Sequence, residues 1–294
     1  MASFIMAGRM QAAIFIVIST LISLVLPPLA LFTHAAIGLI TLRHGWQQGA
    51  LFALLGSILI AGIAVFIKQQ PSAGLITGLT SLLPIVLIAS ILAFSRSWDK
   101  TLQAVLLLAC GGVLVFHMIH PNTTSYWQPI IEAYKPTLQQ VYQLSDSKMD
   151  EYINQAASWA TGTFAAVFAL FGIISLIVAR NWQAMLFNPG GLGEEFRNIH
   201  IGKPAATALV IGIIIAVFTG LQLPVELIMV GITVFMFQGL SLAHSIVKQL
   251  DANGLWLVGL YGLMFLLLVQ MIVLLATFGI IDNFADFRKK LVKR

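Results

Sequence analysis

The sequence predicts an all-α protein, a polytopic transmembrane helical bundle with about eight or nine spans. Hydrophobic residues make up 59% of the 294 residues and charged residues only 9%, whereas soluble domains carry roughly 25% charged residues. The mean hydropathy is +0.94, and uncharged runs near the length of about 20 residues that a helical span needs recur along the chain. The run Ala208–Gly220 is apolar on every face, which excludes the alternating pattern of an outer-membrane barrel.

Nine apolar segments divide the chain, and they fall at about 11–26, 29–42, 49–67, 75–94, 101–119, 157–179, 204–221, 225–247 and 254–279. Pro27 and Pro28 lead into the short second segment, which is therefore expected to be tilted, broken or re-entrant. Gly74 and Gly78 form a GxxxG pair, which would let two helices approach closely. We expect the segments to form one integral membrane domain over residues 1–294.

Lysine and arginine residues indicate the orientation, because cytoplasmic loops of membrane proteins carry an excess of them. Over the first six segments, a cytoplasmic N-terminus places more basic residues inside than outside. Nine full crossings would then put the basic C-terminal residues outside, against the same rule. We therefore expect eight crossings of a bacterial inner membrane, one re-entrant segment, and both termini in the cytoplasm.

Two connecting regions are long enough to carry structure of their own. Residues 120–156 are expected in the periplasm as an amphipathic helix on the membrane surface, because Ile131, Tyr134 and Leu138 recur at roughly helical spacing. Residues 180–203 are expected in the cytoplasm and read RNWQAMLFNPGGLGEEFRNIHIGK.

A glycine-rich turn in the cytoplasmic region is the first candidate site. Proline presets one backbone angle and glycine permits positive φ, so the motif NPGG is typical of a tight turn. The acidic residues after it would repel an anion, and no Walker lysine–serine pair is present, so nucleotide hydrolysis is not expected. A partner or ligand site and a plain turn before a solvated interfacial helix are the alternatives. The candidate residues are Asn188, Pro189, Gly190, Gly191, Glu194, Glu195 and Arg197.

Glu226 is the second candidate, because it is the only acidic residue in the stretch between Lys203 and Lys248. An ionisable group in hydrocarbon is costly unless it has a role, so Glu226 beside Gln222 would line a substrate or proton path. The alternative is a place in a connecting turn at the water interface.

Three histidines, His34, His117 and His244, lie within or near the apolar segments, and His34 is kept as a ligand candidate. Hydrogen bonds between helices are their expected role, because they lack the HxxxH, HExxH or cysteine companions of a metal site. Cys110 is the single cysteine, and serine, histidine and acidic residues form no recognisable triad or paired-carboxylate set. No catalytic residue, metal or cofactor is therefore expected.

Basic residues follow the last apolar segment, namely Arg288, Lys289, Lys290, Lys293 and Arg294. Attraction to anionic lipid, about 1 kcal/mol per basic side chain near the surface, explains such a tail, and docking of a protein partner is the alternative. The other basic residues are scattered between the spans, so a nucleic-acid partner is not expected.

Two stretches resemble the YybS-like family of bacterial inner-membrane proteins, and the resemblance would cover nearly the full chain. The first is similar to a WQAMLxNPGGxxEEF pattern from Trp182 to Phe196, and the second ends in the DFR of residues 286–288. The family is distantly similar to the S-components of energy-coupling-factor (ECF) vitamin transporters and to the rod-shape protein MreD. This resemblance implies a compact, S-component-like core without an ATPase, although this chain has more apolar segments than a six-helix S-component.

Three functions follow in order of preference. The first is a transport-type or ligand-binding component that holds a small molecule or lipid among its helices. The second is a membrane scaffold for cell-envelope or morphogenesis proteins, which would bind a cytoplasmic or membrane protein partner. An intramembrane lipid-modifying enzyme is third. In each case the lipid bilayer is the surrounding partner.

Overall fold

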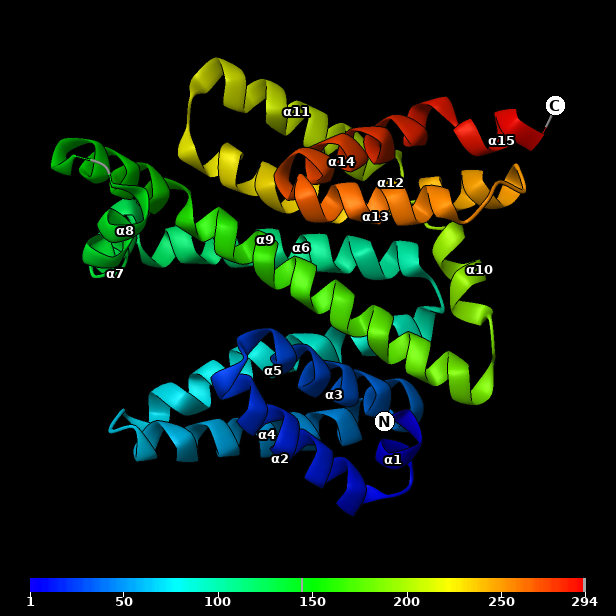
Figure 1. The fold of residues 1–294 in the computed structure, drawn as a ribbon, viewed down its shortest axis with the longest axis horizontal. Coiled ribbons are helices and arrows are strands. Elements are labelled where there is room, and N and C mark those ends of the chain that lie inside the picture. The colour runs from blue at the N-terminus through cyan, green and yellow to red at the C-terminus, as the bar shows by residue number, and fades with distance from the viewer. Residues whose placement is uncertain (144, 293–294) are drawn as a thin grey trace. The chain divides into compact units, whose positions relative to one another are not determined.

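The computed structural model describes residues 1–143 and 145–292, and this part of the chain is all-helical, with 88% of residues in helices and no strand (Figure 1). In order, the helices are α1 (Ala2–Met6), α2 (Arg9–Val25), the short 3₁₀ helix η1 (Pro27–Leu29), α3 (Ala30–His44), α4 (Trp46–Phe66), α5 (Pro71–Ser95), α6 (Trp98–Ile119), α7 (Thr123–Glu132), α8 (Lys135–Tyr142), α9 (Asp146–Phe187), α10 (Gly191–Arg197), α11 (Lys203–Thr219), α12 (Gln222–Gln249), α13 (Leu255–Leu266), α14 (Leu268–Ala285) and α15 (Phe287–Val292).

Six of these helices are long and apolar enough to cross a membrane, namely α4, α5, α6, α9, α12 and α14. The apolar helices α2, α11 and α13 are shorter, with 17, 17 and 12 residues. A rise of about 1.5 Å per residue makes even a 17-residue helix shorter than the roughly 30 Å hydrocarbon core. The predicted all-α fold with multiple membrane-type helices is confirmed at this level.

The chain divides into two compact units. Unit 1 comprises Met1–Val105 and Leu170–His200, and unit 2 comprises Leu106–Ala169 and Ile201–Arg294. Helices α6 and α9 each supply residues to both units.

In unit 1, α4 and α5 form a closely packed pair. A Cβ atom on Gly78 would lie 2.5 Å from the Cα atom of Ser57, and one on Gly74 would lie 2.8 Å from that of Ala61. Only glycine permits helix backbones to come this close, so the close approach predicted from the GxxxG pair is confirmed. α3 packs against both helices through a continuous buried stretch, residues 33–41.

The two prolines between α2 and α3 are accommodated by η1. Pro27 and Pro28 stand at the start of that single 3₁₀ turn, where a proline displaces no backbone hydrogen bond. The second apolar segment therefore folds as an unbroken 15-residue helix, α3, rather than as a broken one.

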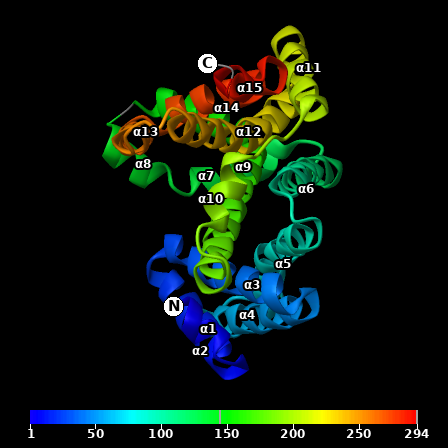
Figure 2. The same cartoon turned by 90° about the vertical axis from the view of Figure 1, so that its right-hand side faces the viewer.

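In unit 2, α12 is the central helix, lying between α11 and α13 with α14 across it (Figure 2). Its most apolar 18-residue window is 72% buried, against 17–39% for the other five long apolar helices, so most of its circumference faces protein. Gly239 of α12 and Gly279 of α14 lie at their crossing point.

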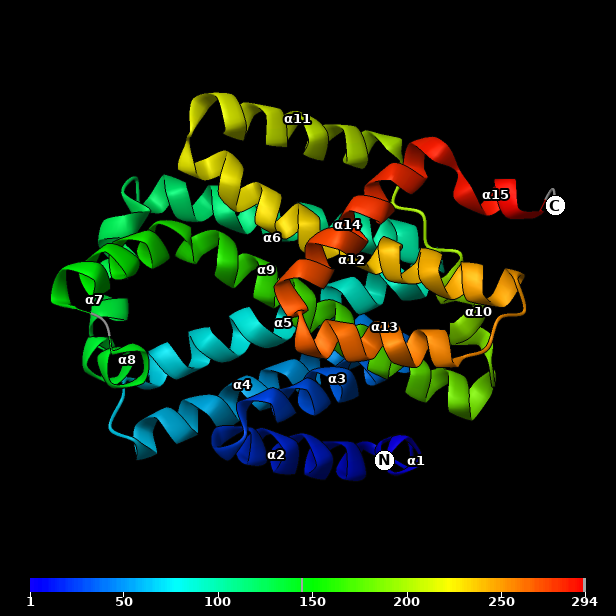
Figure 3. The same ribbon diagram turned by 45° about the horizontal axis from the view of Figure 1, so that its top comes forward.

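The last apolar segment, expected as one helix over 254–279, is divided in the structure. Leu267 leaves the helical conformation with φ −128° and ψ 51°, which ends α13 and starts α14. Tyr261 of α13 contacts His244, and Asn283 near the end of α14 contacts Gln238, so both arms lie against the C-terminal half of α12. The segment is a helical hairpin, as Figures 1 and 3 show.

The region 120–156 was expected as one amphipathic helix and forms α7, α8 and the first turns of α9 instead. Pro136, in the first turn of α8, explains the division, because its ring cannot continue the preceding helix. Lys135 of α8 pairs with Asp150 of α9, and that hydrogen bond raises the pKa of the lysine.

Candidate functional site

The start of α12 positions the main candidate site, in unit 2. α11 ends at Gly220, whose positive φ of 62° is easily adopted by glycine, and α12 begins two residues later. Pro224 is tolerated in the first turn because backbone N–H groups there have no partner inside the helix. Glu226 follows and is fully buried, with 0% of its surface exposed.

The carboxylate of Glu226 has two side-chain partners. His117 Nε2, at the end of α6, lies 2.5 Å from Glu226 Oε2, and Gln222 Nε2 donates to Glu226 Oε1 over 3.0 Å. A buried carboxylate is stable only with such partners, because desolvation of an unpaired charge is expensive. Glu226 lies within α12 and is buried there, so the alternative that placed it in a connecting turn is wrong.

Gln222 connects this carboxylate to two further helices. Its Nε2 atom donates to Thr123 Oγ1 of α7 over 2.7 Å and to the carbonyl oxygen of Ser158 in α9 over 2.6 Å. Gly162 of α9 lies directly against Glu226, where a Cβ atom would be 2.6 Å from the glutamate Cα. Helices α6, α7, α9 and α12 thus all contribute to the group, which brings together the predicted residues Gln222 and Glu226.

An aromatic group lies on the same helices. Trp127 of α7 stacks on Phe164 at 4.7 Å and on Phe116 at 5.6 Å between ring centroids, and its Nε1 atom donates to Thr161 Oγ1 over 2.9 Å. Phe116 is the residue before His117 in α6, and its ring also meets the edge of Tyr126 at 5.1 Å between ring centroids. Trp127 could not be singled out from the sequence, because nothing in the sequence shows which helices it meets.

The glycine-rich turn lies in unit 1 and has the predicted conformation. Gly190 has a φ of 86°, and the N–H of Gly191 donates to the carbonyl oxygen of Asn188 over 3.1 Å. Pro189 lies between them, and the seven-residue α10 starts at Gly191. The turn prediction is confirmed, whereas a ligand at the turn stays a prediction.

The acidic residues after the turn differ in environment. Glu195 forms an ion pair with Arg180 of α9, and the indole of Trp98 in α6 donates to the same carboxylate over 3.2 Å. The interpretation that the acidic side chains here are simply solvated is therefore wrong for Glu195. Glu194 is exposed, and Arg197 is half-buried.

A polar cavity of about 250 Å³ opens beside this ion pair. Arg96, Arg180, Gln183 and Glu195 line it together with apolar side chains of α3 and α5. Gln183 also accepts a hydrogen bond from Arg180 over 2.9 Å, so the polar atoms of the cavity largely satisfy one another.

The histidines take the roles that were expected of them. In unit 1, His34 Nε2 lies 2.9 Å from Ser81 Oγ of α5, and its ring meets the edge of Phe171 at 5.0 Å. In unit 2, His117 contacts Glu226 and His244 Nε2 lies 2.9 Å from the Tyr261 hydroxyl. Hydrogen bonding between helices is confirmed for all three, and His34 belongs to a different unit from Glu226.

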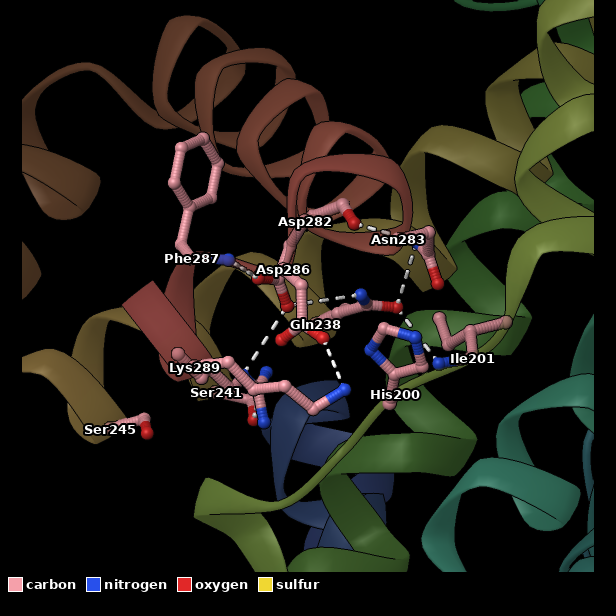
Figure 4. Close-up of polar contacts among 12 residues, drawn as sticks. His200, Ile201, Gln238, Ser241, Ser245, Asp282, Asn283, Asp286, Phe287 and Lys289 are labelled. Atoms are coloured by element: carbon pink, nitrogen blue, oxygen red, sulfur yellow. Dashed lines mark hydrogen bonds and ion pairs between the residues drawn. The ribbon is translucent and has the colours of Figure 1, made fainter. Parts of the chain in front are cut away.

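A second buried polar group in unit 2 was not anticipated (Figure 4). Gln238 Oε1 accepts from the N–H of Ile201 over 2.8 Å, and Asn283 Oδ1 accepts from that of Gly202 over 2.8 Å. Asn283 Nδ2 also donates to Gln238 Oε1 over 3.3 Å. Gln238 and Ser241, one helical turn apart in α12, were the sequence signal for this group.

The basic C-terminal residues do not all face the membrane surface. The Arg288 side chain is only 15% exposed, forms an ion pair with Asp282 at 3.3 Å, and donates to Ser241 Oγ over 3.1 Å. For Arg288 the lipid-contact interpretation is therefore wrong. Lys289 is 83% exposed and pairs with Asp286, which raises the pKa of the lysine. The Lys290 side chain, Lys293 and Arg294 lie outside the described residues.

Among the described residues, no group of three or more His, Cys, Asp or Glu side chains is arranged to hold a metal ion. Comparison of the chain with protein-family models, curated proteins and solved structures finds no match.

Proposed function

We propose that this chain is a transport-type membrane component that binds a small molecule or lipid and uses Glu226 as its proton-binding group. The observation that carries the proposal is the complete burial of Glu226 at 2.5 Å from His117. Ionisable residues placed among membrane helices commonly form proton relays or substrate paths. Structural ion pairs inside proteins can often be replaced by apolar residues without loss of stability, so packing alone does not require a buried pair here, and its presence supports a functional role.

The chemistry of the pair suits proton exchange. The imidazole of His117 and the carboxylate of Glu226 share one hydrogen bond. A proton bound by one group therefore changes the electrostatic environment of the other. The two N–H groups of the Gln222 amide are shared among three acceptors, namely Glu226, Thr123 and the carbonyl oxygen of Ser158, so these hydrogen bonds would be redistributed if Glu226 bound a proton. This redistribution would let α12 move relative to α7 and α9, and that movement would couple protonation of Glu226 to ligand binding.

The topology that we propose has eight crossings of a bacterial inner membrane, with α2, α3, α4, α5, α6, α9, α11 and α12 as the spans. The helices α2, α3 and α11 have 17, 15 and 17 residues and are shorter than the hydrocarbon core, so they would cross where the bilayer is locally thinned or with the help of flanking residues. The hairpin α13–α14 supports this count, because it returns to the end of α12 from which it starts. Both termini would then be cytoplasmic. In unit 1, the helix ends that carry Arg9, Arg43, Arg96 and Arg180 are those on the proposed cytoplasmic side, as the positive-inside rule requires.

Membership of the YybS-like family, with an S-component-like core, is part of the same proposal. It rests on the two quoted stretches, 182–196 and 286–288. Fold analogy alone does not assign a function, so the Glu226 group carries the functional argument.

Replacement of Glu226 by glutamine tests the proposal. Dicyclohexylcarbodiimide reacts with protonated carboxyl groups in apolar surroundings, so we expect it to label Glu226 in membranes. Native mass spectrometry of the protein released gently from its membrane should show a bound small molecule or lipid. Glu226→Gln should abolish the labelling and reduce ligand retention at least about tenfold, equivalent to about 1.4 kcal/mol.

Glu151→Gln is the matched control, because Glu151 is exposed on α9 and should leave both readouts unchanged. The proposal fails if Glu226 is not labelled at any pH, or if the Glu226→Gln variant keeps the ligand profile of the unmodified protein.

A scaffold role is the second candidate, and exposed apolar side chains beside the glycine-rich turn favour it. Met185 is 66% exposed and Phe187 is 49% exposed, next to the exposed Glu194. Crosslinking in cells followed by mass spectrometry should capture a protein at this surface, and Glu194→Lys should release it. A captured partner that is unaffected by this charge reversal, or no crosslinked species, would contradict the scaffold role.

A further inference from the structure

A second cavity in unit 1, of about 360 Å³, lies among α1, the start of α2, the end of α3 and the first half of α4. Its polar lining consists of Arg9, His44 and Gln48. Its apolar lining includes Ile5, Ile40 and Phe52, which are 2%, 3% and 6% exposed. The cavity therefore combines a polar rim with a buried apolar floor.

The polar rim is basic and has no opposing charge. No acidic residue lines the cavity, and none occurs in the sequence before Asp99. Arg9 is exposed and forms no ion pair or side-chain hydrogen bond with any described residue. The rim is thus free to bind an anion, and a guanidinium group matches the geometry of phosphate oxygens.

The position of the rim suits a membrane lipid. Gln48 lies in the first turn of α4, one of the helices apolar enough to cross a membrane, and Trp46 at the start of that helix is 61% exposed. Tryptophan at the end of an apolar helix is typical of the water–membrane interface, where lipid phosphates also lie. A free phosphate ion has no apolar group that could pack against the apolar floor beneath the rim, whereas a lipid has an acyl chain.

We propose that this cavity binds an anionic glycerophospholipid. Arg9 binds the phosphate oxygens, while His44 and Gln48 donate hydrogen bonds to the headgroup. The upper part of an acyl chain lies against Ile5, Ile40 and Phe52. This lipid site does not include Glu226. An experiment that disproves the lipid site therefore leaves the proposed role of Glu226 untouched, and the reverse also holds.

Lipid titration of the delipidated full-length protein in a mild detergent tests the site. Native mass spectrometry should show one bound phosphatidylglycerol molecule. Its binding should require a lower lipid concentration than the binding of phosphatidylcholine, which carries no net charge. Arg9→Gln should weaken phosphatidylglycerol binding at least about tenfold, and His44→Gln should weaken it to a smaller extent. Inorganic phosphate at millimolar concentration should not displace the lipid.

Lys68→Gln is the matched control, because it removes an exposed basic residue just beyond the opposite end of α4. An equal loss in Lys68→Gln and Arg9→Gln would show nonspecific charge attraction and overturn the proposal. Displacement by inorganic phosphate would overturn it in favour of a soluble anion, and unchanged binding in Arg9→Gln would exclude the site. Unaltered elution in size-exclusion chromatography would show that the variants are folded.

Discussion

Asp282→Ala is expected to destabilise the protein by about 3–5 kcal/mol, the range measured when one partner of a buried ion pair is removed. Asp282 is 1% exposed and pairs with Arg288 at 3.3 Å. It also accepts a hydrogen bond from the N–H of Phe287 over 3.2 Å, at the turn between α14 and α15. Truncation leaves the guanidinium group of Arg288 without its carboxylate in a site that is only 15% exposed. The midpoint of thermal unfolding in detergent measures the loss.

Two further variants separate the charge effect from a general effect of substitution in this region. Asp286→Asn should change the unfolding temperature little, because the pair of Asp286 with Lys289 is exposed to solvent and asparagine also tolerates the left-handed backbone conformation of this residue, φ 48°. The double variant Asp282→Leu with Arg288→Met should recover part of the loss, since no unpaired charge then remains. If Asp282→Ala unfolds at the same temperature as the unmodified protein, the pair does not hold α15 in place.

Gly239→Ala is expected to lower stability by about 2–3 kcal/mol, at the upper end of the usual cost of overpacking a core. A Cβ atom there would lie 2.6 Å from the carbonyl carbon of Leu275 and 2.9 Å from its Cα atom. Gly279 of α14 is equally close, because a Cβ atom on it would lie 2.9 Å from the backbone nitrogen of Gly239. Neither helix backbone can move aside without separating α12 from α14. The same unfolding experiment in detergent measures the effect.

Gly262→Ala on α13 is the matched control, because a Cβ atom at that position meets nothing within 4 Å. Since alanine favours a helix over glycine by about 1 kcal/mol, this variant should be as stable as the unmodified protein or more stable. Equal destabilisation by the two alanines would contradict the close crossing of α12 and α14.

The positions of the apolar helices could be predicted from the sequence, because the length of an apolar run is a local property. The division at Leu267 could not. Leucine stands on both sides of it, without the proline or glycine that usually marks the end of a helix. The contacts of Tyr261 and Asn283 with α12 show the hairpin only after the chain has folded.

Two residues of the candidate site could be predicted from the sequence, but their contacts with other helices could not. Glu226 and Gln222 stand out because they are polar at the start of an apolar run. Their partner His117 is 109 residues from Glu226 along the chain, and no local pattern connects them. Arg288 shows the opposite case, because a run of basic residues indicates a solvated tail although the first of them is largely buried.

The order of synthesis sets a condition on the assembly of α12. Gln238 forms its hydrogen bond with Asn283 only after 45 more residues have been made, whereas Ile201, its other partner, precedes it by 37. Until α14 has been made, the side-chain amide of Gln238 can bond to the N–H of Ile201 but lacks its contact with the side-chain amide of Asn283. The central helix of unit 2 therefore completes its polar contacts only after the hairpin has been synthesised, and this unit cannot reach its native state before then.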